Sequence, residues 1–378
     1  IIPSTFDPRL ISVIPSAVAE AAVKSGAARK KIVDFELYKD QLSNRLDPSM
    51  SLMQGINAKI RKNPKRVIFA EGEDENMLKA AIEFGKNKLG IPILIGVEKR
   101  IKDQLKKIGL DENYKIEIVN STDKEKREKY VKHLYKKLQR EGQLERDVDR
   151  LVRNDRIAWG SSMIACKDAD AMVTGNIRHY AASIEKLKKV VEARPGEEIF
   201  GMTMIVSKGK TILVADTNVQ DFPSSERLVN VSKSCVRVAR LFGFDPKVAF
   251  LSHSTFGKPI SKNTKHVRNA IDLLKKDKVD FDFDGEMQPD VALNPIYQEI
   301  YPFSKIVGNA NILIMPALHS AAISTKLMKV FGGGKLIGPL LIGLGLPIEV
   351  APLRASTSEI LNLASIASYS SGVIDYTN

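Results

Sequence analysis

Cysteine is scarce in this sequence, with Cys166 and Cys235 the only two among 378 residues. Two thiols in a chain of this length exclude a disulfide-stabilised scaffold and fit a reducing compartment, so we expect a cytoplasmic protein. Cys235 lies in a stripe of apolar residues that recur at helical spacing between Leu228 and Phe242. We therefore interpret it as a packing residue and not as a reactive thiol.

Long apolar runs and aromatic residues are also rare. No run reaches the ~18 residues that a membrane-spanning helix needs, so we expect no contact with a membrane. Aromatic residues make up 6% of the chain and do not alternate with basic ones, which argues against a nucleic-acid surface despite a net charge of +13. Basic and acidic residues are mixed, as in residues 123–129, which is typical of a solvated helix face. A phosphorylated small molecule remains compatible with this charge.

Several catalytic and metal-binding motifs are missing. The five histidines are scattered, without the His-Glu-x-x-His or Cys-x-x-Cys spacing of metal sites, so we predict no metal in this chain. No Gly-x-Ser-x-Gly nucleophile elbow occurs. The glycines at 332–334 have neither dinucleotide nor Walker spacing, and three glycines after a helix normally end it.

The sequence does contain a regular alternation of strand and helix patterns. Apolar runs of strand length occur at residues 66–70, 91–96, 114–119, 171–175, 202–206, 211–215, 248–251 and 312–315. Helical patterns separate most of them, for example at residues 75–89, 124–140 and 264–276. This order predicts an α/β fold of mostly parallel, doubly wound sheets, whose ligands bind beyond the carboxyl ends of the strands.

The stretch from Ala310 to Ser356 shows this alternation most clearly. An apolar run at 312–315 ends at Pro316, and residues 319–330 then predict a helix with apolar residues on one side. Glycines end that helix, and a second apolar run begins at Leu336. Strand, loop, helix, glycine turn and strand form a crossover unit. We therefore expect the loop after the first strand and the glycine turn to lie near a ligand.

Two further strand ends carry polar groups. Ser252, His253 and Ser254 close a strand, where their hydroxyls and the loop amides can bind phosphate, although such residues more often cap a loop. Asp284 and Glu286 flank a glycine and suit either acid–base chemistry or a turn. We favour the structural role for these acids because carboxylates repel phosphate.

These segments resemble a known family. Residues 310–356, the Ser-x-Ser at 252–254 and the Asp-Gly-Glu at 284–286 are similar to phosphate acetyltransferases, and more closely to the version fused to the C-terminus of bacterial NADP-dependent malic enzymes. The resemblance implies two doubly wound α/β/α subdomains with a cleft between them, an architecture like that of isocitrate and isopropylmalate dehydrogenases.

The same resemblance divides the chain. Residues 1–62 are similar to the tail of the malic enzyme catalytic region and end in a linker at 47–63. The phosphate acetyltransferase-like domain is then residues 63–378, with subdomain 1 at 63–196 and 340–378 and subdomain 2 at 197–339. The chain begins Ile1-Ile2-Pro3, without an initiator Met or a basic leader, so we expect a fragment of a longer protein.

The resemblance also implies which residues form the site. Positions that would bind acetyl-CoA or phosphate fall at Arg153, Ser252, His253, Ser254, Pro316, His319, Gly333, Gly338 and Arg354. The family's Asp-Leu-Ser-Arg-Gly run is altered here: Pro352 and Leu353 occupy the serine and arginine positions, and Arg354 is displaced by one residue. Glu359 stands where the family has its catalytic base, so Arg354 and Glu359 are the candidates for catalysis.

Two other positions depart from the family pattern. Glu185 replaces an arginine that faces phosphate, and Ala322 replaces an asparagine in the Pro316 loop. A glutamate opposes phosphate binding where an arginine would assist it. These losses predict a domain that no longer transfers acetyl groups. Binding of acetyl-CoA is lost less easily than catalysis, because binding needs only shape and a few hydrogen bonds.

We interpret the chain as a regulatory and oligomerisation domain of an NADP-dependent malic enzyme. The resemblance implies acetyl-CoA or CoA as effector, with the upstream malic enzyme domain and further copies of the chain, as a dimer or larger oligomer, as partners. The parent reaction is oxidative decarboxylation of malate to pyruvate with NADP and Mg²⁺ or Mn²⁺, and this chain itself is expected to need no cofactor.

Two alternatives stay open. The first is a working phosphate acetyltransferase, which makes acetyl phosphate and CoA from acetyl-CoA and phosphate. The second is a purely structural oligomerisation module that ignores CoA.

Overall fold

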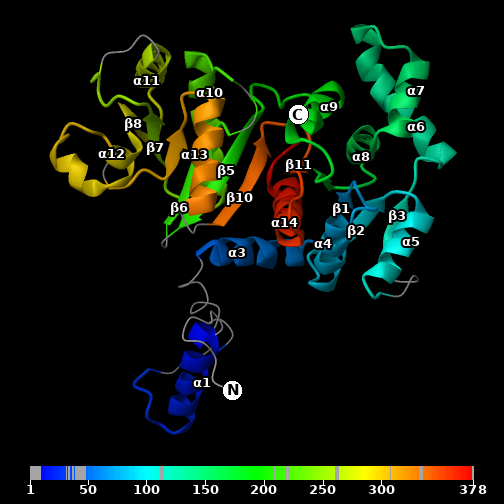
Figure 1. Cartoon of the computed structure of the whole chain (residues 1–378), viewed down its shortest axis with the longest axis horizontal. Helices are drawn as coiled ribbons and strands as arrows, with labels where there is room; N and C mark the ends of the chain where they lie inside the picture. Colours follow the sequence, from blue (N-terminus) through cyan, green and yellow to red (C-terminus); the bar gives the residue numbers. More distant parts are fainter. Residues whose placement is uncertain are drawn as a thin grey trace.

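The computed structural model describes residues 10–30, 32, 35, 38, 48–110, 115–207, 210–217, 219, 221–259, 264–306, 308–331 and 335–376. Within these residues the strands form one five-stranded and one six-stranded sheet. The two sheets are neighbours, and helices cover both faces of each, so the protein has the predicted doubly wound α/β architecture (Figure 1).

The first sheet is entirely parallel, in the order β11-β4-β1-β2-β3. Its strands are β1 (Lys65–Phe69), β2 (Gly90–Ile95), β3 (Glu117–Val119), β4 (Ala171–Gly175) and β11 (Ile348–Ala351). The strands are apolar along most of their length because both faces of the sheet are covered. Since β11 comes from the end of the chain, two separated segments build this sheet.

Two groups of helices cover the first sheet. One face carries α4 (Glu75–Lys86), α5 (Glu98–Lys107) and α14 (Thr357–Val373). The other carries α6 (Lys124–Leu138), η1 (Gln139–Glu141), α7 (Glu145–Asn154), α8 (Arg156–Ala165) and α9 (Tyr180–Val190). Polar side chains set where several of these helices begin: Asp74 accepts a hydrogen bond from the amide of Met77, and Ser356 forms a capping box with Glu359.

The second sheet has the order β10-β5-β6-β9-β7-β8. Its strands are β5 (Phe200–Ser207), β6 (Lys210–Ala215), β7 (Lys247–Leu251), β8 (Asp282–Met287), β9 (Ile312–Ile314) and β10 (Lys335–Ile342). β5 pairs antiparallel with both β6 and β10, whereas the other three pairs are parallel. Three of its five strand pairs are parallel, so the prediction of a mostly parallel sheet holds here too, and the two antiparallel pairs both involve β5.

Helices also cover both faces of the second sheet. One face carries α10 (Ser225–Leu241) and α11 (Lys265–Asp277), and the other carries α12 (Pro289–Leu293), η3 (Pro295–Glu299) and α13 (Leu318–Phe331). Cys235 of α10 is fully buried, as predicted, and burial raises the pKa of its thiol. No helix in the described part of the chain is long and apolar enough to cross a membrane.

The predicted crossover unit is present as β9, α13 and β10. The helix passes over β6 and β5, because β10 joins the sheet at its far edge. Within α13, the small side chains of Ala321 and Thr325 face the sheet, whereas Ile323 and Leu327 are more than half exposed. The glycine turn at 332–334 lies outside the described residues.

The expected linker at 47–63 is instead largely helical. α3 (Pro48–Lys62) buries Met53, Ile56 and Ile60 in the main core, where the helix packs against α14. Those three residues recur at helical spacing in the sequence, so the signal was present. α1 (Leu10–Lys24) is a separate helix in the part of the chain that precedes α3.

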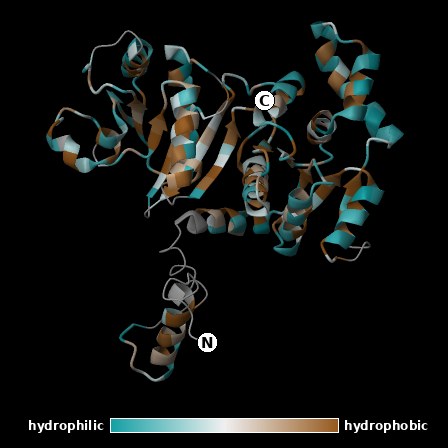
Figure 2. Cartoon of the chain, in the orientation of Figure 1, coloured by the Kyte–Doolittle hydropathy of each residue, from teal (hydrophilic) through white to brown (hydrophobic). Residues whose placement is uncertain are grey.

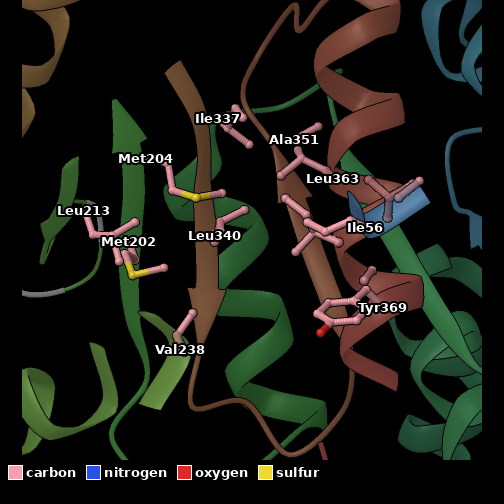
Figure 3. Close-up of a cluster of buried hydrophobic side chains, with 14 of the residues drawn as sticks. Ile56, Met202, Met204, Leu213, Val238, Ile337, Leu340, Ala351, Leu363 and Tyr369 are labelled. Atoms are coloured by element: carbon pink, nitrogen blue, oxygen red, sulfur yellow. The ribbon is translucent and has the colours of Figure 1, made fainter. Parts of the chain in front are cut away.

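One apolar core runs through both halves of the molecule. Figure 3 shows Met202, Met204 and Leu340 of the second sheet on one side and Leu363 and Tyr369 of α14 on the other. Because α14 packs on strands of both sheets and α3 packs on α14 and on β5 and β6, the two sheets share a buried boundary.

The chain passes between the two sheets twice, near residues 192–194 and 343–345, and backbone hydrogen bonds join these two connections. The amide of Arg194 donates to the carbonyl of Gly343 at 2.8 Å, and the amide of Gly345 donates to the carbonyl of Glu192 at 2.8 Å. Glu349 of β11 is buried, and its carboxylate accepts a hydrogen bond of 2.9 Å from the amide of Leu341 in β10. This carboxylate thus joins the edge strands of the two sheets.

Candidate functional site

An open hollow of about 920 Å³ lies beyond the carboxyl ends of β7 and β9. Its lining residues are Phe222, Ser225, Ser252, His253, Thr264, Lys265, His266, Asn269, Pro316, Ala317, His319 and Ser320. Ser252 and His253 directly follow β7, and Pro316 follows β9. The hollow therefore lies where the carboxyl-end rule for parallel strands predicts a ligand.

Three long helices begin at the rim of this hollow. Ser225 and Lys265 are the first residues of α10 and α11, and Ala317 directly precedes α13. Helix N-termini carry unpaired amide groups and the positive end of the helix dipole, so they favour anions. Among the residues that the structure describes, the lining contains one lysine and three histidines but no carboxylate. Its electrostatic character suits a ligand that carries phosphate or another anionic group.

A buried network fixes the loop after β7. Ser254 is fully buried, and its hydroxyl donates to Oε1 of Glu286 at 3.0 Å. The other oxygen of Glu286 accepts a hydrogen bond of 2.8 Å from Nε of Arg268, and the amide of Gly257 also donates to the carboxylate. Ser252 reaches this network through Ser254, with 3.3 Å between the two hydroxyl oxygens. Glu286 therefore has structural contacts that match the role favoured for the Asp-Gly-Glu segment.

Aromatic and imidazole groups form the other wall. The rings of Phe222 and His319 are tilted against each other, with 5.5 Å between their centres. Nε2 of His266 lies 3.1 Å from the carbonyl oxygen of Pro316, which connects α11 to the loop before α13. These contacts hold the imidazoles around the hollow without an acidic partner among the lining residues.

The structure brings only part of the predicted set into this hollow. Ser252, His253, Pro316 and His319 line it, and Ser254 lies behind its wall. Arg153 instead lines a smaller hollow of about 110 Å³ at the carboxyl ends of β2 and β3. All six assignments remain predictions as binding residues, but Arg153 lies apart from the other five.

Arg354 and Gly338 lie in neither hollow. Arg354 follows β11 with an exposed side chain and φ of 58°, and its amide donates to the carbonyl of Asn176 at 2.9 Å. Gly338 lies within β10 with φ of 118°, where an added Cβ would come 2.9 Å from the carbonyl oxygen of Met202. Strand packing therefore requires a glycine at position 338. Gly333 lies outside the described residues.

Glu359 is engaged in contacts that hold the start of α14. Its carboxylate accepts hydrogen bonds from the amide and hydroxyl of Ser356, both at 2.9 Å, and pairs with Lys329 of α13 at 3.1 Å. Burial acts to raise the pKa of Glu359, but the Ser356 and Lys329 contacts together lower it below its ordinary value. A carboxylate so held is a poor general base near neutral pH.

Several lining residues were not predicted from the sequence. Phe222, Ser225, Lys265 and Asn269 come from the first turns of α10 and α11 or the residues before them. The sequence segment 221–224 does indicate a helix start, yet nothing local shows that two helix starts meet at one strand edge. Only the order of strands in the sheet brings these positions together.

Comparisons with known proteins identify the family of the chain. The phosphate acetyl/butaryl transferase family pattern matches residues 51–368. The chain is 44% identical to the NADP-dependent malic enzyme of Rhizobium meliloti over 373 residues, covering 98% of this chain and 49% of that protein. It is 30% identical over 326 residues to the phosphate acetyltransferase of Clostridium acetobutylicum, covering 84% of this chain and 97% of that protein.

Solved structures show the same fold. The EutD phosphotransacetylase from Staphylococcus aureus superimposes with a TM-score of 0.77 at 25% identity, covering 85% of this chain and 98% of that one. A phosphotransacetylase from Streptococcus pyogenes gives the same TM-score at 27% identity and the same coverage. The chain spans about half the length of the malic enzymes it matches. It belongs to the phosphate acetyl/butaryl transferase family, in the form that its malic enzyme relatives carry as part of a longer protein.

Proposed function

We propose that this chain is the acetyl-CoA-binding regulatory domain of an NADP-dependent malic enzyme and that it has lost acetyl transfer. The observation that carries the proposal is the hollow, whose described lining gathers three helix N-termini, three imidazoles and one lysine without a carboxylate. The phosphate groups of CoA suit such a rim, and the ring of Phe222 offers an apolar surface beside it. The relatives' names supply the activity of the longer protein, malate oxidation with NADP.

The loss of acetyl transfer is inferred from Glu359, the residue at the position of the family's catalytic base. Catalysis needs a carboxylate that is free to take the thiol proton, with a pKa near the working pH. Glu359 is instead held by Ser356 and Lys329, and its pKa is lowered. The exposed acid Glu185 further weakens phosphate binding at the position where the family has an arginine. The parent protein's NADP and divalent metal belong, on this proposal, to the upstream half.

Substitutions in the hollow test where acetyl-CoA binds. We expect His319→Ala and Ser252→Ala each to weaken acetyl-CoA binding about 10- to 150-fold, because a hydrogen bond to a charged ligand contributes about 1.5–3 kcal/mol. Isothermal titration calorimetry of acetyl-CoA into each variant measures the change, with free CoA as a second ligand. His133→Ala, which changes a histidine of α6 outside the hollow, is the matched control and should bind like the wild type.

The alternatives give different results in the same experiments. A structural module would give no saturable heat with acetyl-CoA at millimolar concentration, which would remove the effector proposal. A working transferase would form acetyl phosphate from acetyl-CoA and phosphate, and its activity would fall on Arg354→Ala. Saturable binding that the hollow variants leave unchanged would place the ligand elsewhere and contradict the site.

A further inference from the structure

The smaller hollow, of about 110 Å³, lies at the carboxyl ends of β2 and β3, and we call it the β2–β3 hollow. In the first sheet these two strands are at the opposite end from β11, the strand that is joined to the second sheet. Ligands of parallel sheets bind beyond the carboxyl ends of the strands, so this hollow is a candidate for a second site. Its lining residues are Glu73, Ile95, Gly96, Val97, Asn120, Ser121, Val152, Arg153, Asn154, Asp155, Arg156 and Trp159.

The wall of the β2–β3 hollow includes a buried donor without a partner. Trp159 of α8 is the single tryptophan of the chain and is 1% exposed. Its ring packs edge-on against the ring of Tyr130, with 5.0 Å between the ring centres. Nε1 of Trp159 has no hydrogen-bond partner among the residues that the structure describes. Buried donors are almost always paired in folded proteins, so a ligand oxygen in the hollow would supply the acceptor that this N–H lacks.

The rim of the β2–β3 hollow carries a positive charge that is available to a ligand. Arg153 lies near the end of α7, a mainly hydrophilic helix (Figure 2), and its side chain is exposed. It makes no ion pair or side-chain hydrogen bond with the residues that the structure describes. The two carboxylates of the lining are already paired, Glu73 with Arg156 at 2.9 Å and Asp155 with Lys186. The guanidinium of Arg153 is therefore the charge that the lining leaves unbalanced.

We propose that the β2–β3 hollow binds a small organic acid through its carboxylate, as a second ligand site in addition to the acetyl-CoA hollow. A guanidinium presents paired N–H groups that match the two oxygens of a carboxylate, and the indole N–H of Trp159 offers a further donor. A doubly charged phosphate is disfavoured, because Glu73 and Asp155 belong to the same wall and repel negative charge. A volume of 110 Å³ equals about four waters of about 30 Å³ each, which suits an acid of about three or four carbons.

The position of Trp159 gives this proposal a direct test. Fluorescence excited at the red edge of tryptophan absorption comes from Trp159 alone, since the chain has no other tryptophan. Sodium propionate, sodium succinate and inorganic phosphate are titrated separately into the 378-residue chain at constant ionic strength. We expect at least one of the two carboxylates to change the emission saturably, with the same half-saturation by calorimetry. Phosphate should bind at least about 10-fold more weakly than that carboxylate.

Two arginine variants on one helix show whether the ligand lies in the β2–β3 hollow. Arg153→Gln should weaken binding of the carboxylate about 10- to 150-fold, because it removes a hydrogen bond between charged groups. Arg146→Gln, which changes an exposed arginine of α7 outside the lining, is the matched control and should bind like the wild type. Both side chains are exposed, so circular dichroism should show an unchanged fold. Trp159→Phe keeps an aromatic ring but removes the donor, and calorimetry should show weaker binding.

Three results would overturn the proposal. The first is the absence of saturable fluorescence change and saturable heat with both carboxylates. The second is binding that Arg153→Gln leaves unchanged or that Arg146→Gln weakens equally, because the ligand would then lie elsewhere. The third is phosphate that binds as tightly as the carboxylates, since the site would then be a general anion site. The acetyl-CoA hollow is tested separately by His319→Ala, so failure here leaves the proposed function standing.

Discussion

The Glu349→Gln variant should be more stable than the wild type by roughly 4–5 kcal/mol at pH 9 and nearly equal to it at pH 4. Burial raises the pKa of Glu349 from its ordinary value of 4.5 to about 8, and the hydrogen bond from the amide of Leu341 offsets this only in part. Between pH 4.5 and about pH 8, the carboxyl of Glu349 is protonated in the folded chain but ionised in the unfolded chain, so the folded chain holds one more proton. The free energy of unfolding therefore falls as the pH rises through this window.

A glutamine at this position keeps the contact and removes the titration. Its side-chain oxygen can still accept from Leu341, which joins β10 to β11 across the two sheets. The variant is neutral at every pH, so it avoids the cost of an ionised group in an apolar site. The gain should appear only where the wild-type carboxyl ionises.

Urea unfolding at pH 4, 7 and 9 measures this difference. Glu71, whose pKa burial raises to about 7, titrates in both proteins and cancels in the comparison. Glu83→Gln, on the exposed side of α4, is the control and should leave the difference near zero at each pH. A gain from Glu349→Gln of equal size at pH 4 and pH 9 would contradict a carboxyl buried in its neutral form.

The Gly343→Ala variant should lose about 3–5 kcal/mol of stability, with a lower yield of folded protein. Gly343 has φ of 83°, and an added Cβ would lie 2.0 Å from the carbonyl oxygen of Glu198. That oxygen belongs to the backbone, so a side-chain rotation cannot relieve the clash. The affected segment is the crossing where Arg194 bonds to Gly343, so the strain falls on the connection between the sheets.

A second glycine variant separates the stability cost of the steric clash from the cost of the left-handed backbone conformation. Gly243 follows α10 with nearly the same φ, 82°, but has nothing within 4 Å of an added Cβ. Gly243→Ala should therefore cost only about 1–2 kcal/mol, the usual penalty for a left-handed residue that is not glycine. Urea unfolding of both variants at one pH gives the comparison. Equal losses would show that the crossing is not tightly packed.

Local patterns in the sequence predicted four of the five strands of the first sheet but not β11. The strands at 66–70, 91–96 and 171–175 carry apolar runs bounded by clear helix patterns, and each forms close to its predicted place. The α3 helix was not predicted, although Met53, Ile56 and Ile60 have helical spacing. The segment was interpreted as a linker because it lies between the part that resembles malic enzymes and the part that resembles phosphate acetyltransferases. Its burial depends on α14, which lies at the other end of the chain.

The functional hollow could be predicted only in part for a related reason. Strand ends identified Ser252, His253 and Pro316, since polar residues after buried strands are visible in the sequence. Phe222 and Lys265 lie at helix starts that become neighbours only through the order β9-β7 in the sheet and the placement of α10 and α11 on it. Likewise, the pattern of α13 showed one apolar side but not that this side faces away from the sheet.

The most direct test of the account combines binding and turnover in one sample. Acetyl-CoA is titrated calorimetrically into the 378-residue chain in phosphate buffer, and the same solution is then assayed for acetyl phosphate. Our account predicts saturable binding with no acetyl phosphate above the level of a protein-free control. Acetyl phosphate that accumulates in proportion to protein would contradict the loss of catalysis, and the absence of any saturable heat would contradict the hollow as an acetyl-CoA site.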